Sequence, residues 1–235
     1  MKLFVGGYYL VEMTPIRGGM NHDILPKNIL SLSDCICNLH PLEFCLSWIS
    51  SSKNDKEKYA KKLGINLEKF HELQVKTDND FNANKYGFSE VFSDLECAKE
   101  YYNQYFNNIP NLKLVAIATT EKHRNLFIES SESMNIADDF HGIYKTFKNK
   151  NKNIIDPTMK FLGHDILGFE YGSFHSYLCS SLENDFSEKL DIKFNPVGLI
   201  DELALAEKAS DYANNPENHV EPALWQPWAV YEILV

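Results

Sequence analysis

The C-terminal third holds the residue types that covalent catalysis would need. His164 and Asp165 are followed at 174–180 by FHSYLCS, which contains His175 and Cys179. If that stretch is helical, His175 and Cys179 lie one turn apart on the same face. An imidazole beside a thiol can activate it as a thiolate, with Asp165 or Glu170 orienting the base. The alternative is a buried thiol and a histidine at the edge of the core. We favour it because a nucleophile and its base usually come from separate elements.

Two groups of residues have metal-ligand chemistry. His164 and His175 could share an ion with a carboxylate. A second group of four soft ligands falls within eleven residues: Cys35, Cys37, His40 and Cys45. The Cys-x-Cys spacing suits a single chelate turn poorly, and the interleaved apolar residues are typical of a core. We therefore predict core packing rather than zinc, and no cofactor.

Motifs with a known mechanism are missing from the sequence. It contains no G-x-x-x-x-G-K-S/T, G-x-G-x-x-G, H-E-x-x-H or G-x-S-x-G pattern. Phosphate-cradling loops and hydrolase elbows therefore have no support, and a non-enzymatic function is favoured.

The negative charge is concentrated at one end of the chain. Residues 161–235 contain 13 acidic residues and three lysines, which accounts for the whole net charge of −10. Such a local field attracts a basic protein and repels nucleic acid. We expect the partner-binding carboxylates to lie on two helix faces. They are Glu183, Asp185, Glu188 and Asp191 in the first group, and Asp201, Glu202, Glu207 and Asp211 in the second.

Length and composition predict a globular protein of the cytoplasm. The chain has 235 residues, of which 44% are apolar and 13% aromatic. Five cysteines fit reduced thiols better than a disulfide framework. No stretch approaches the roughly 20 apolar residues of a membrane span, and the apolar run at 3–11 reads as a strand. The lysine-rich stretch 51–62 predicts a solvated helix ending near Gly64.

Strands and helices alternate without a regular βαβ rhythm, so the sequence predicts an α+β fold. We expect a mixed or antiparallel sheet with helices packed on it, in a single domain 1–235. A subdivision near 150–158, where the charge changes, is the alternative. Expected strands cover 2–13, 112–119, 159–169, 191–195 and 228–235. Expected helices cover 94–107, with a capping box of Ser93 and Glu96, and also 139–148, 174–186 and part of 196–214.

Three C-terminal segments resemble bacterial proteins encoded beside polymorphic toxins. They are GHDILGFEYGSFHSYLC, FNPVGLID and EPALWQPWAV, within about 75 residues. In such systems a small acidic immunity protein blocks a toxin domain, often a basic nuclease. The resemblance implies an inhibitor that binds its cognate toxin through an acidic surface, and it carries over no catalytic residue. The alternative function is a small cytoplasmic enzyme with a Cys/His or metal site around His164, His175 and Cys179.

Overall fold

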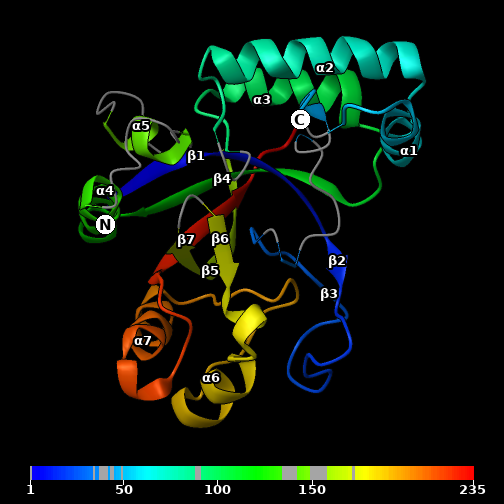
Figure 1. Ribbon diagram of the computed structural model, residues 1–235. Coiled ribbons are helices and arrows are strands. Elements are labelled where there is room, and N and C mark those ends of the chain that lie inside the picture. Colours follow the sequence, from blue (N-terminus) through cyan, green and yellow to red (C-terminus); the bar gives the residue numbers. More distant parts are fainter. Residues whose placement is uncertain are drawn as a thin grey trace.

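A five-stranded antiparallel sheet organises the chain, in the order β1-β4-β7-β5-β6 (Figure 1). The computed structural model describes residues 2–33, 35–36, 42, 45–48, 50–87, 91–133, 142–148, 158–170 and 173–235. The strands are β1 (Leu3–Glu12), β4 (Leu112–Thr120), β5 (Lys160–Glu170), β6 (Ser173–Ser176) and β7 (Leu224–Glu232). Helices pack on the sheet, so the predicted α+β class is confirmed.

The centre of the sheet is apolar on both faces. β4 carries the run LKLVAIATT and lies between β1 and β7, where its middle residues are all buried. Such a continuous apolar run is typical of a central strand. β1 bulges between Val5 and Gly7. At Gly7, φ is 152° and an added Cβ would lie 2.2 Å from Val91. The bulge lets the backbone approach Phe92, which pairs with Tyr8.

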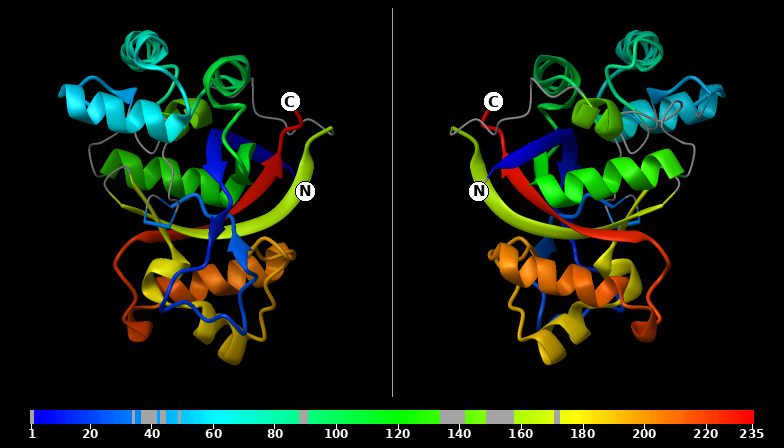
Figure 2. Two further views of the ribbon diagram at one scale, coloured as in Figure 1. Left: turned by 90° about the vertical axis from the view of Figure 1, so that its right-hand side faces the viewer. Right: turned by 90° about the vertical axis from the view of Figure 1, so that its left-hand side faces the viewer.

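Neighbouring strand residues point to opposite faces, and each face has its own helices. Tyr9, Val115 and Trp228 belong to a core formed with α4 (Glu121–Ser133) and α5 (Gly142–Lys148). Alternate residues such as Leu10 and Leu114 face the other way. Three helices cover that face at the β1–β4 end: α1 (Lys53–Leu63), α2 (Leu67–Asn82) and α3 (Leu95–Tyr101). Two more pack near β5 and β7: α6 (Glu183–Leu190) and α7 (Leu203–Asn214) (Figure 2).

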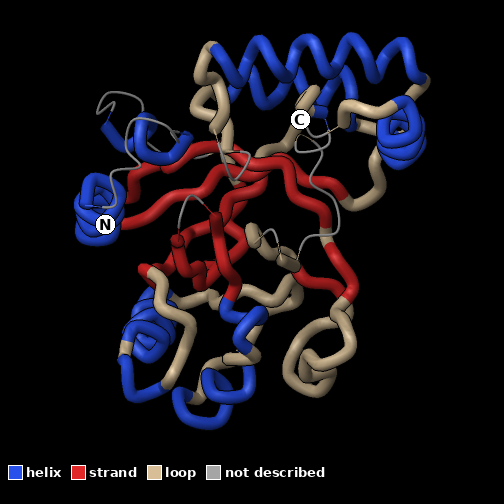
Figure 3. The backbone as a smooth tube through the Cα atoms, viewed as in Figure 1, coloured by secondary structure: helices blue, strands red, loops and turns tan. Residues whose placement is uncertain are grey.

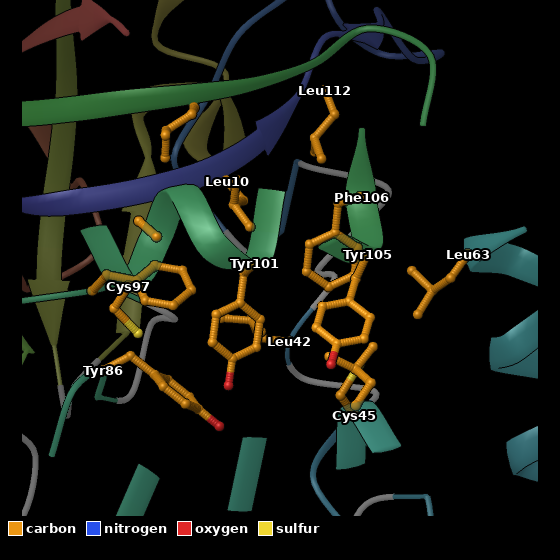
Figure 4. Packing of buried hydrophobic residues seen from close by; sticks show 14 of the residues in the cluster. Leu10, Leu42, Cys45, Leu63, Tyr86, Cys97, Tyr101, Tyr105, Phe106 and Leu112 are labelled. Atoms are coloured by element: carbon orange, nitrogen blue, oxygen red, sulfur yellow. The ribbon is translucent and has the colours of Figure 1, made fainter. Parts of the chain in front are cut away.

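The core beneath α1–α3 is rich in aromatic rings. α3 continues into a π-helical turn, η3 (Tyr102–Phe106), and the rings of Tyr101 and Phe106 stack with their centroids 6.4 Å apart. Figure 4 shows these rings between the strands and the helices, with Cys45 and Cys97 in the same cluster. The N-cap of α3 is Asp94, which accepts from the Cys97 N–H at 3.0 Å. The predicted cap, Ser93, instead donates to Lys85 O, so the helix begins one residue later than expected.

Two predicted elements of the C-terminal third are wrong. The expected helix 174–186 is split into strand β6, a 3-10 turn η4 (Tyr177–Ser180) and the start of α6. Phe174 and Ser176 are buried and pair with β5, and this burial and pairing favour a strand over a helix. Residues 191–195 form no strand. They enter a turn in which the Asn195 side chain accepts from the N–H groups of Val197 and Leu199.

An N-terminal segment packs against the acidic third. β2 (Thr14–Pro15) pairs with β3 (Asn28–Ile29), and the loop between them reaches α6. Asn21 donates its N–H to Glu183 and its side-chain amide to Asn184, at 3.2 and 2.6 Å. The last element before β7 is a 3-10 turn, η5 (Pro216–Asn218).

The acidic third is also part of the main sheet. It contributes β5, β6 and β7, and β7 hydrogen-bonds to both β4 and β5. Figure 3 shows the strands in red between the groups of helices. Strands on both sides of the 150–158 region therefore belong to one sheet, whereas residues 149–157 lie outside the described part of the chain.

Candidate functional site

The acidic carboxylates are presented by α6, α7 and the turns that flank them, at one end of the molecule (Figure 1). α7 lies close to the sheet because its inner face carries small residues, Ala206, Ala209 and Ala213. Ser210 Oγ donates to Trp225 O at 2.9 Å and fixes the helix to β7. α6 is anchored by Phe186, whose ring stacks on Tyr177. Both helices therefore hold their polar faces toward solvent.

Five of the eight predicted binding carboxylates are exposed. They are Glu188, Asp191, Asp201, Glu202 and Asp211, called here the acidic face. Within the described residues, the side chains of Glu188, Asp191 and Glu202 make no hydrogen bond or ion pair, so their charge is uncompensated. Asp201 accepts from Asn195 Nδ2 at 2.7 Å and remains exposed.

Two further carboxylates are half-buried and have partners within the protein. Asp185 Oδ1 lies 3.0 Å from Lys189 Nζ, and Oδ2 accepts from the Tyr212 hydroxyl at 2.8 Å. These contacts lower the pKa of Asp185. Glu207 Oε1 lies 3.6 Å from the ring of His123 on α4. Desolvation is the main cause that lowers the pKa of His123, which leaves the imidazole neutral at pH 7.

Glu183 lies away from the surface. Its side chain is 0% exposed, and Oε1 accepts from the N–H of Asn21. A carboxylate in this position holds the 16–27 loop on α6 and cannot contact a partner. This burial could not be predicted from the sequence, because Glu183 begins a helix whose other acids are at least partly exposed.

A cleft beside the acidic face was not expected from the sequence. It has a volume of about 770 Å³ between the end of α7, η5 and the start of β7. Apolar lining comes from Phe169, Ala213 and Leu224, and polar lining from Asn215 and Glu221. Glu221 Oε2 lies 3.7 Å from His175 Nδ1 at the rim. Exposed Glu217 and Glu221 extend the negative surface toward this cleft.

The predicted Cys/His pair does not form as expected. His175 lies on β6 and contacts Glu221, whereas Cys179 lies in η4 with its sulfur 3.6 Å from Ser33 Oγ. Desolvation raises the pKa of the Cys179 thiol to about 11, so the group is protonated at neutral pH. An activated thiolate needs the opposite shift.

Asp165 and His164, two candidate catalytic or metal-binding residues, instead contact backbone groups of neighbouring segments. Asp165 is 0% exposed, and its Oδ2 accepts from the N–H of Leu32 at 3.1 Å. Burial raises the pKa of Asp165 to about 7. The ring of His164 lies 3.1 Å from Ile200 O, and desolvation lowers its pKa. Both residues thus connect β5 to the segments packed on its two faces.

The metal-ligand groups are not assembled in the described part of the chain. Among these residues, no group of three or more His, Cys, Asp or Glu side chains is placed to hold a metal ion. Cys35 is exposed, while Cys45 is buried in the core beneath α1–α3. Cys37 and His40 lie outside the described residues.

No helix in the described ranges is both long and apolar enough to cross a bilayer. Comparison with known proteins finds no matching family model, no similar curated protein and no similar solved structure.

Proposed function

We propose that this protein is an immunity-type inhibitor, which binds and neutralises a basic toxin domain through its acidic face. The toxin assignment rests on the resemblance of the C-terminal sequence segments. The binding assignment rests on chemistry. Its main support is the set of exposed carboxylates on α6, α7 and their flanking turns, of which Glu188, Asp191 and Glu202 have no partner among the described residues.

Unpaired exposed carboxylates suit recognition better than stability. Each stays hydrated in the free protein and contributes little to folding, because an exposed carboxylate in water gains little from nearby charges. A cationic partner would instead reduce the repulsion among these carboxylates. The attraction speeds encounter and selects against wrong partners. Asp191 also ends α6 in the left-handed conformation, with φ of 54°, which fixes its direction at the helix terminus.

The densest group of lysines lies elsewhere. α1 carries Lys53, Lys56, Lys58, Lys61 and Lys62, and it packs with α2 and α3 at the opposite end from α6 and α7 (Figures 1 and 2). A basic partner would be attracted more strongly to the end with α6 and α7 than to the lysine-rich helix α1. The proposed inhibitor therefore has a preferred orientation of approach.

The experiment compares two variants with the same net charge. The face variant carries Glu188→Gln, Asp191→Asn, Glu202→Gln and Asp211→Asn. Asparagine tolerates the left-handed conformation of position 191. The control variant carries Glu68→Gln, Glu72→Gln, Glu121→Gln and Glu129→Gln, four exposed carboxylates on other helices.

Association is measured by stopped flow with the purified toxin domain encoded beside the gene. For the wild type we expect the on-rate to fall roughly tenfold between 50 and 300 mM NaCl. At low salt the face variant should associate roughly tenfold more slowly, and the control should stay within about twofold of the wild type. Equal on-rates for the face and control variants would contradict the acidic-face proposal. Absence of any binding to that domain would contradict the immunity assignment.

A further inference from the structure

Two exposed cysteines that are distant in the sequence meet at the surface. Cys35 follows the segment that leaves β3, and Cys179 lies in the η4 turn after β6. Ser33 joins them: its Oγ accepts the N–H of Cys35 at 3.2 Å and lies 3.6 Å from Cys179 Sγ. Both cysteines therefore lie beside the same serine hydroxyl, and besides desolvation the proximity of Cys35 contributes to the raised pKa of the Cys179 thiol.

Hydrogen bonds hold the backbone segments that carry the two cysteines. On one side, Leu32 N–H donates to the buried Asp165, and Arg17 donates to the carbonyl oxygens of Cys35 and Ile36 at 3.2 and 2.9 Å. On the other side, Ser176 Oγ accepts from Leu178 N–H and caps the η4 turn. The proximity of the two cysteines at Ser33 is thus the result of two anchored segments, which favours a bond between these two sulfurs.

We propose that Cys35 and Cys179 are a redox modification site, at which a hydroperoxide drives formation of a reversible intramolecular disulfide. One thiol, as its thiolate, attacks the peroxide oxygen and becomes a sulfenic acid, while the leaving oxygen takes a proton to form water or an alcohol. The second thiolate then attacks the sulfenic sulfur and expels hydroxide, which is protonated to water. The two sulfurs lose two electrons and two protons in total, and the peroxide accepts both.

The environment sets the pH dependence of this reaction. Desolvation, with the neighbouring Cys35 as a further cause, raises the pKa of Cys179 to about 11, and the hydrogen bond from Ser33 opposes the shift. Little thiolate therefore forms at this residue at pH 7. We expect disulfide formation to accelerate as pH rises from 7 to 9, since the thiolate is the attacking species.

The bond would link the 17–36 segment to the β6–η4 turn. The same segment already contacts α6 through Asn21, so oxidation would restrain the end of the molecule that carries the acidic face. This inference does not depend on the proposed inhibitor function, because it concerns the free protein alone.

The test treats the reduced full-length protein with hydrogen peroxide and digests it with trypsin under non-reducing conditions. Cys35, Cys37 and Cys45 lie on the peptide 28–53, and Cys179 is the only cysteine of 161–189. We expect these two peptides to be joined in the wild type and in Cys37→Ser, and to be separate in Cys35→Ser and Cys179→Ser. Dithiothreitol should separate the joined peptides.

Thermal unfolding provides an independent readout in the intact protein. The oxidised wild type should melt roughly 5–10 °C higher than its reduced form, because the bond closes a long loop. Cys179→Ser should show no such rise after the same treatment. A joined peptide pair in Cys35→Ser, a disulfide that forms only between molecules, or a wild type that forms no disulfide would each overturn the proposal.

Discussion

Folding shifts the pKa values of two buried aspartates, Asp80 and Asp165, in opposite directions. Asp80 is 5% exposed, and desolvation opposes its ionisation. Hydrogen bonds from Lys85, Lys76 and Tyr101, at 2.7 to 3.0 Å, outweigh that cost and lower its pKa. Asp165 lacks a positive partner, and one of its oxygens, Oδ1, has no hydrogen bond within the described residues. At Asp165 the effect of desolvation therefore exceeds that of the hydrogen bonds, and its pKa rises to about 7.

The raised pKa of Asp165 predicts a loss of stability as pH increases. In the unfolded chain this carboxyl ionises near pH 4, whereas in the folded protein it stays protonated until about pH 7. The unfolded state therefore binds fewer protons between these values, and stability falls with rising pH until it levels off above 7. The penalty is on the order of 4 kcal/mol at pH 8.

Asp165→Asn should remove this penalty while retaining an oxygen that accepts from Leu32 N–H. We expect its melting temperature, relative to the wild type, to increase between pH 4 and pH 7.5 and then to stay constant. Differential scanning calorimetry across pH 4–8.5 measures this difference. Asp211→Asn, at an exposed carboxylate, serves as the control and should give a nearly constant difference. A constant difference for Asp165→Asn as well would show that Asp165 is already ionised in the folded protein.

At the scale of single elements, apolar patterning located the sheet better than the helices. β1, β4, β5 and β7 carry long apolar runs, and the expected strands overlap all four. α2 and α4 were not expected. Their buried faces include polar residues such as Gln74, Thr77 and Asp80 in α2, and His123 and Arg124 in α4, which weaken a helical apolar stripe. Polar groups that find partners only in the tertiary structure leave no pattern in the sequence.

The candidate site could be predicted only in part for a similar reason. Charge counting identified the acidic third, and Asp201, Glu202 and Asp211 lie on or just before the helix expected within 196–214. It could not separate exposed acids from Glu183, which is buried, or Glu232, which pairs with Lys113 and Lys160 across the sheet. The cleft and the proximity of Cys35 to Cys179 depend on segments far apart in the chain, which a local sequence pattern cannot predict.

The small inner face of α7 leads to a prediction about its packing. Ala206 is 0% exposed between the helix and the sheet, so Ala206→Leu should overfill this space and lower the free energy of unfolding by about 1–3 kcal/mol. Ala204→Leu places the same side chain at an exposed position of the same helix and should change stability little. Urea unfolding of both variants measures the comparison. Equal effects would mean that α7 does not depend on close packing of its alanines.

At the scale of the whole molecule, the last strand completes the sheet. β7 lies between β4 and β5, so the N-terminal and C-terminal strands become joined only when it is in place. Trp228 on β7 is fully buried and packs against Phe147 from α5 and Phe174 from β6. Side-chain packing and backbone hydrogen bonds therefore both cross from one part of the chain to the other, which favours cooperative unfolding.

This connectivity predicts one unfolding transition despite the abrupt change in charge near 150–158. Trp225 and Trp228 are buried and report on β7, whereas Trp48 is 53% exposed, so Trp48→Phe leaves fluorescence that follows the sheet alone. Far-UV circular dichroism follows mainly the helices, of which α1–α5 precede the charge change. In urea, the two signals of Trp48→Phe should give the same midpoint and the same slope, because loss of β7 removes the support of both helical layers. Separate midpoints would instead show that the acidic third unfolds independently, with the interface between β4 and β7 as the weaker link.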